Sequence, residues 1–221
     1  MKYFKKPESK PIDSPYLKPK KSVSYTESSY VDKSTALWYH STFAQCLIER
    51  FGKEKAEDVS KAYSLGASTS KWEGANVFWQ IDSSGNVHGG KVMNYDTSFR
   101  RVKEPNPQIT WAHTLLKSKD YIMEQCFFGE HLLKESPSSV VGIVESEKTA
   151  MIASIEIPQF VWIATGGKNG CKWTTNSVNQ VLNGRKVIMF PDLGAYDEWN
   201  KKAPLIAGAD VRVSDLLEKY A

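Results

Sequence analysis

The strongest constraint on the fold is a repeated alternation of apolar runs and helix-forming segments that begins near residue 140. The runs SVVGIVE, FVWIAT and RKVIMF are almost entirely apolar, and a segment of helical character follows each of them. Strands of this kind are buried on both faces, as in a parallel sheet covered by helices. Crossovers between parallel strands are right-handed, so the strand ends meet at one edge. The sequence therefore predicts an α/β domain over residues 138–221.

Polar side chains are expected at the carboxyl edge of this sheet. Glu145 follows the first strand, Asp192 follows the third, and the turn after the second contains Gly166, Gly167 and Lys168. A single acid in such a position could simply favour the start of the next helix. Two rigidly held acids on one edge indicate a site for Mg²⁺ or Mn²⁺. The glycines would let backbone N–H groups approach a phosphate, to which the lysine adds a positive charge.

Residues 34–135 predict a smaller mixed α+β subdomain. Ser34 is expected to cap a helix that ends at Gly52, and a second short helix should follow. A three-stranded meander is then predicted from the segments NVFWQI, VHGGKVMNY and FRRVK, with Gly85 in the first turn. Residues 1–33 are rich in Lys, Ser, Pro and Tyr, and predict a flexible basic tail or linker.

The distribution of charge indicates a polyanionic partner. The chain has a net charge of +4, and residues 86–119 alone hold six basic residues against two acids. A local basic stripe of this kind favours phosphate contacts, although a solvated hairpin face explains the charge equally well. The predicted phosphate-binding residues of the stripe are Lys91, Arg100, Arg101 and Lys103. The chain has no apolar stretch long enough to cross a membrane and no secretory signal, so we expect a cytoplasmic protein without a membrane partner.

Four segments carry a resemblance to a known family. VGIVESEKTA resembles the first Toprim motif, an apolar strand followed by Glu and a helix. RKVIMFPDLGAYDEW resembles the second, an apolar strand followed by Asp-x-Asp. FWQIDSSGNVHGGKVMNY and CFFGEHLLKES resemble the segments that precede Toprim in DnaG-type bacterial primases. Over roughly three-quarters of its length the chain is therefore similar to the primase-like Toprim proteins of plasmids, phages and conjugative elements.

The resemblance implies roles for particular residues. Glu145 matches the family's Glu, which is a metal ligand or a general acid or base. Asp192 matches the first Asp of Asp-x-Asp, but the second position is Gly194, which has no side chain. Asp197 lies one helical turn further and is an expected substitute ligand through a water, and Glu147 is the alternative.

The function implied by the resemblance is that of a DNA primase-like nucleotidyltransferase in DNA replication. It would bind Mg²⁺ or Mn²⁺, nucleotides and a single-stranded DNA or RNA/DNA template, and it would work with a helicase or another replication protein. One alternative is a Toprim nuclease. Another is a degenerate, non-catalytic module that binds DNA or a replication partner, which Gly194 favours.

Overall fold

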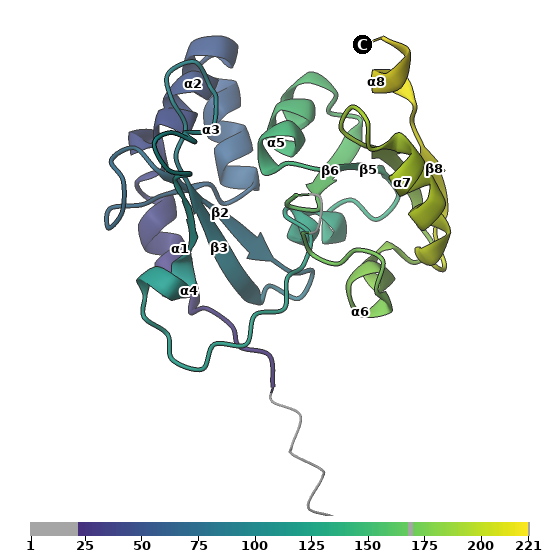
Figure 1. Cartoon of the computed structure of the whole chain (residues 1–221), viewed down its shortest axis with the longest axis horizontal. Helices are drawn as coiled ribbons and strands as arrows, with labels where there is room; N and C mark the ends of the chain where they lie inside the picture. The colour runs from purple at the N-terminus through teal and green to yellow at the C-terminus, as the bar shows by residue number, and fades with distance from the viewer. Residues whose placement is uncertain (1–21, 168–169, 221) are drawn as a thin grey trace, which may run out of the picture.

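The computed structural model describes residues 22–167 and 170–220, which form two four-stranded sheets lying side by side (Figure 1). The strands are β1 (Gly66–Ala67), β2 (Asn76–Ile81), β3 (Val87–Met93), β4 (Ile109–Trp111), β5 (Val140–Val144), β6 (Phe160–Ala164), β7 (Lys186–Phe190) and β8 (Asp210–Val213). The α-helices are α1 (Ser28–Thr35), α2 (Thr42–Phe51), α3 (Lys53–Ala62), α4 (Ala112–Leu115), α5 (Glu147–Glu156), α6 (Asn176–Asn179), α7 (Tyr196–Lys202) and α8 (Leu216–Lys219). Short 3-10 helices are η1 (Trp38–His40), η2 (Glu130–Lys134), η3 (Gln180–Leu182) and η4 (Ala203–Leu205). None of the helices in these ranges is long and apolar enough to cross a membrane.

The first sheet is antiparallel, with strand order β1-β2-β3-β4. Its central hairpin, β2–β3, was predicted from the sequence. The Asp82 carboxylate accepts hydrogen bonds from the backbone N–H groups of Ser84 (2.8 Å) and Asn86 (2.9 Å). Gly85 has a φ of 89°, a conformation that glycine adopts without strain. An Asx-type turn therefore fixes the register of the hairpin.

The predicted third strand, FRRVK, is not a strand. Phe99 has a φ of 62°, and its N–H donates to the carbonyl of Asp96 at 2.9 Å. The Asp96 N–H in turn donates to the carbonyl of Arg100 at 2.8 Å. A tight turn of this kind is incompatible with extended backbone. On the side of β3 that faces away from β2, the pairing strand is instead β4, whose Trp111 lies opposite Lys91.

The N-terminal helices also differ from the prediction. The helix expected from Ser34 to Gly52 is divided into α1, η1 and α2, and the side chain that caps α2 is Ser41, whose Oγ accepts from the Ala44 N–H at 3.2 Å. The Ser34 hydroxyl instead accepts from Trp79 Nε1 at 2.8 Å. Residues 22–33 are part of the fold because α1 begins in them, so a flexible tail does not extend to residue 33. The rest of the predicted tail lies outside the described residues.

Replacing Ser41 with alanine is expected to lower the free energy of unfolding by about 1 kcal/mol, the usual effect of losing an N-cap. Urea denaturation of the S41A variant measures this change. Ser138, which is exposed and caps no helix, provides the control substitution S138A. Equal stability of S41A and S138A would contradict the assignment of Ser41 as the cap of α2.

The second sheet is parallel throughout, with strand order β6-β5-β7-β8. Its strands are the apolar runs of the sequence, and α5, α6 and α7 occupy the connections between them. Val144, the last residue of β5, pairs with Ala164 on one side and Phe190 on the other. The predicted fold class is thus confirmed: a helix-flanked parallel sheet is preceded by a smaller mixed α+β part.

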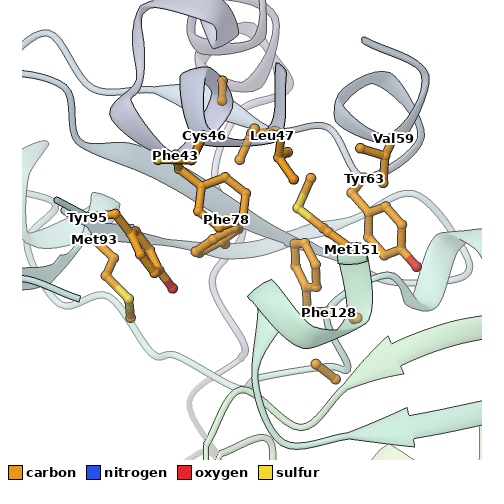
Figure 2. Packing of buried hydrophobic residues seen from close by; sticks show 14 of the residues in the cluster. Phe43, Cys46, Leu47, Val59, Tyr63, Phe78, Met93, Tyr95, Phe128 and Met151 are labelled. Carbon is orange, nitrogen blue, oxygen red and sulfur yellow. The ribbon is translucent and has the colours of Figure 1, made fainter. Parts of the chain in front are cut away.

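One hydrophobic cluster joins the two sheets. On α5, Ala150 and Met151 are fully buried, and they belong to the same cluster as Phe43 of α2 and Phe78 of β2. Figure 2 shows Met151 among side chains that come from the first half of the chain. The predicted parts 34–135 and 138–221 therefore share a core, to which α5 contributes together with β5 and β6.

Candidate functional site

Two acidic residues follow neighbouring strands of the parallel sheet. Glu145 comes directly after β5, and Asp192 lies two residues beyond the end of β7. Because Val144 and Phe190 pair in register, both acids leave the sheet at the same edge. Glu145 is half-buried and Asp192 is exposed. The structure therefore places the two predicted acidic residues on one edge, as the strand pattern indicated.

The donor set at this edge fits a hydrated Mg²⁺ ion. Mg²⁺ often keeps several waters and binds through one or two carboxylates together with substrate phosphates, and Glu145 and Asp192 supply two carboxylates. Within residues 22–167 and 170–220, no three His, Cys, Asp or Glu side chains form a group that could hold a metal ion. Asp197, in the first turn of α7, belongs to no such group in these ranges, and its role as a substitute ligand through a water stays a prediction. At the position without a side chain, the Gly194 N–H donates to the Glu218 carboxylate at 2.8 Å.

The three glycines of the turn after β6 donate their N–H groups to backbone carbonyls and not to a ligand. The N–H groups of Gly166 and Gly167 both donate to the carbonyl of Glu145, at 3.0 and 2.9 Å. The Gly170 N–H donates to Gly167 at 2.9 Å. The predicted phosphate contact through these glycines is therefore wrong, because their N–H groups already have backbone carbonyl acceptors, the main one being Glu145 after β5. Lys168 lies outside the described residues.

Lys91 is part of a buried ion pair and is not on the basic surface. Only 5% of the residue is exposed. Its ammonium donates to the Glu147 carboxylate, which begins α5, and to the Gly166 carbonyl at 2.5 Å. The prediction of Lys91 as an exposed phosphate contact is wrong for this reason. The ion pair links β3 of the antiparallel sheet to the edge of the parallel sheet that carries Glu145.

A group of basic side chains gathers around Phe99. The Lys148 ammonium lies 4.9 Å from the centre of the Phe99 ring and donates to the Phe99 carbonyl at 2.9 Å. The Arg50 guanidinium lies 5.3 Å from the centre of the same ring. Burial, and then the charges of Arg50 and Arg101, lower the pKa of Lys148 below its usual value. Arg100, Arg101 and Lys103 are exposed, as the prediction requires.

Sequence reasoning missed Arg50 and Lys148. They lie on α2 and α5, far along the chain from the basic stripe, and the turn at Phe99 brings them together. No spacing within the sequence indicates this meeting. The local signal was an aromatic residue followed by two arginines in SFRRVK, and this segment was taken to be a strand.

A second polar region lies around a cavity of about 540 Å³ between the β2–β3 hairpin and the α6–η3 segment. Glu130 borders it, is 5% exposed, and accepts hydrogen bonds from the N–H groups of Ser83 and Phe127, both at 3.2 Å. Burial raises the pKa of Glu130 to about 7, although the two backbone hydrogen bonds act in the opposite direction. No feature of the sequence distinguished Glu130 from an ordinary acidic residue in the first turn of a helix.

Comparison with protein families matches residues 41–193 to the family described as "Domain of unknown function (DUF6371)". The match covers well over half of the chain. The chain belongs to this family. The DUF6371 region contains Lys91, Glu145, Glu147 and Asp192, and it ends before Glu218. No curated protein matches the chain.

Solved structures of bacterial primases share the fold. The RNA polymerase domain of Mycobacterium tuberculosis primase DnaG aligns with a TM-score of 0.53 and 12% identity, over 85% of this chain and 73% of that one. A DnaG catalytic core aligns with a TM-score of 0.51 and 12% identity, over 84% and 70%. The zinc-binding and RNA polymerase domains of Aquifex aeolicus primase align with a TM-score of 0.50 and 16% identity, over 83% and 52%. The DUF6371 chain therefore has a primase catalytic-core fold.

Proposed function

We propose that this protein is a primase-like nucleic-acid-binding protein, in which the parallel sheet is a Toprim domain and Glu145 and Asp192 hold Mg²⁺. The observation that carries the proposal is the exit of these two acids from neighbouring strands at one edge of the sheet. The primase-core fold supports it. One of the similar structures is the Mycobacterium tuberculosis domain in complex with double-stranded DNA.

The chemistry we propose is nucleotidyl transfer to a nucleic-acid strand. A bound Mg²⁺ or Mn²⁺ ion would neutralise charge on the reacting phosphate. The residues of the chain would fix the geometry: Glu145 and Asp192 hold the ion, and the Lys91–Glu147 pair fixes the start of α5 beside them. Nucleotides, a single-stranded template and a helicase or other replication protein are the partners that such an activity would need.

A non-catalytic binding module is the second candidate. Gly194 provides no carboxylate, and its N–H is occupied by Glu218 from α8. Two carboxylates bind a metal ion more weakly than three, so the fold could serve to hold nucleic acid without transferring a nucleotide. A nuclease would use the same metal site and would differ only in the reaction that follows.

Calorimetric titration with Mg²⁺ and Mn²⁺ tests the metal site. We expect the variants E145Q and D192N each to bind the metal at least about tenfold more weakly than wild type, since losing even an outer-shell partner has an effect of this size. The control D210N removes an exposed acid at the start of β8 and should bind normally. D197N tests the predicted role of Asp197: weaker metal binding would show that Asp197 contributes to the site, and normal binding would show that it does not.

Activity assays then separate the candidates. Primer synthesis from nucleoside triphosphates on single-stranded DNA, lost in E145Q, would support the nucleotidyltransferase. Strand cleavage without added nucleotides would indicate the nuclease. Wild-type protein that binds DNA but takes up no metal at millimolar concentration, even with the DNA present, would contradict the metal-dependent activity and leave the binding module.

A further inference from the structure

We propose that Arg50, Arg101 and Lys148 form a phosphate-binding site beside the acidic edge. This inference rests on the proposed function and deepens it, because it names the chemical group that the protein holds and the residues that hold it. Lys148 lies in the first turn of α5, three residues after Glu145. Arg50 lies in the last turn of α2, and Arg101 directly follows the turn formed by Asp96–Arg100.

Phe99 lies between two of the three cationic groups, those of Lys148 and Arg50. It is buried, with 3% of the residue exposed, and the tight turn holds it at a φ of 62°. Its ring lies near both the Lys148 ammonium and the Arg50 guanidinium, at 4.9 and 5.3 Å from the ring centre. Its carbonyl accepts a hydrogen bond from Lys148. A buried aromatic ring therefore fixes cationic groups that would otherwise move freely at the surface.

The arrangement is electrostatically unfavourable without a ligand. In the described ranges none of the three cationic residues forms an ion pair with a carboxylate. Asp96 is the acid whose charge acts on Lys148, but one of its oxygens already accepts from the Arg100 N–H at 2.9 Å. Burial first, and then the charges of Arg50 and Arg101, lower the pKa of Lys148, which agrees with cationic groups held close together. Cations held together in this way are stabilised by a polyanion.

The chemistry of the site suits phosphate in particular. Arginine offers a planar fork of donors to phosphate oxygens, and lysine adds a compact positive charge. The phosphate could belong to a nucleic-acid backbone or to a nucleoside triphosphate. Arg100 and Lys103 are exposed in the same segment as Arg101, so the positive surface continues beyond the three residues, as an extended strand requires.

Binding of fluorescein-labelled single-stranded DNA, measured by fluorescence anisotropy in EDTA at several salt concentrations, tests the site. The variant R50Q/R101Q/K148Q is expected to bind roughly tenfold or more weakly, and the slope of log affinity against log salt should fall by about 2, because each lost phosphate contact removes about 0.7. The control K186Q/K201Q/R212Q removes the same charge from exposed positions of β7, α7 and β8. It should bind with nearly wild-type affinity.

Further variants keep the test decisive. The variant R50K/R101K/K148R retains the three positive charges and should retain most of the DNA binding. Circular dichroism checks that each variant is folded. Competition with ATP distinguishes the two phosphate sources. If ATP displaces DNA from wild type and the triple variant binds neither ATP nor DNA, the site accepts the phosphates of both. If the triple variant loses only DNA binding, the ligand is the nucleic-acid backbone.

The inference and the proposed function fail in different ways. A folded triple variant that binds DNA as well as wild type, or a control that loses binding equally, would overturn the phosphate site. Wild-type protein that binds no nucleic acid would instead overturn the proposed function.

Discussion

Replacing Lys91 with methionine is expected to lower the free energy of unfolding by about 3–5 kcal/mol, the usual effect of removing one partner of a buried ion pair. The Lys91 and Glu147 side chains are 7% and 4% exposed. Without the lysine, the carboxylate of Glu147 would remain buried with no positive partner. The Gly166 carbonyl would also lose the hydrogen bond that Lys91 donates. The loss should therefore combine an uncompensated charge with an unsatisfied acceptor.

Removing both charges should restore much of this stability. Replacement of a whole buried ion pair by apolar side chains of similar volume is often neutral or stabilising, so K91M/E147L should be more stable than K91M alone. Urea denaturation of the four proteins in this double-mutant cycle measures the coupling between the two residues. The exposed pair Lys61–Glu57, with side chains 69% and 38% exposed, is the control, and K61M should change stability far less than K91M does. An effect of K91M no larger than that of K61M would contradict the buried pair.

The ion pair also explains which parts of the site could be predicted from the sequence. Glu145 and Asp192 were found because each follows an apolar strand, and parallel topology places the ends of such strands on one edge. The positions of Lys91 and Arg101 depend on tertiary contacts instead. Both belong to one basic stripe in the sequence. Lys91 forms a buried ion pair with Glu147 of α5, whereas Arg101 is exposed. Composition indicates a basic segment without showing which of its charges are buried.

The errors in the predicted fold have local physical causes. FRRVK has the residue types of a strand, but the positive φ of Phe99 and the hydrogen bonds around Asp96 turn the chain there. The glycines after β6 look like a phosphate loop, but Gly166 and Gly167 give their N–H groups to Glu145. In each case a backbone hydrogen bond decided the conformation, and residue type alone does not encode it. The long apolar strands, which many contacts specify together, were predicted correctly.

The stability of wild-type protein should fall as pH rises through about 7, and Glu130 should be the cause of a large part of this change. The pKa of Glu130 is raised from 4.5 to about 7 by burial. Between these values the folded protein binds a proton that the unfolded chain does not, so the stabilisation is fully present below 4.5 and is lost as pH rises through 7. With 1.36 kcal/mol for each unit of pKa, the contribution amounts to about 3 kcal/mol.

The variant E130Q should remove this dependence because glutamine does not ionise. Its side-chain oxygen can accept from the Ser83 or the Phe127 N–H but not readily from both, so E130Q should be less stable than wild type at acidic pH by about 1 kcal/mol. Above pH 7 E130Q should be more stable than wild type. Wild type then buries the Glu130 carboxylate, which in the described part of the chain has no cationic partner within hydrogen-bonding distance. Urea denaturation from about pH 5 to about pH 8 would show the two stability curves crossing. The exposed Glu57 provides the control E57Q, which should keep the wild-type slope, and parallel curves for wild type and E130Q would show that Glu130 does not titrate in this range.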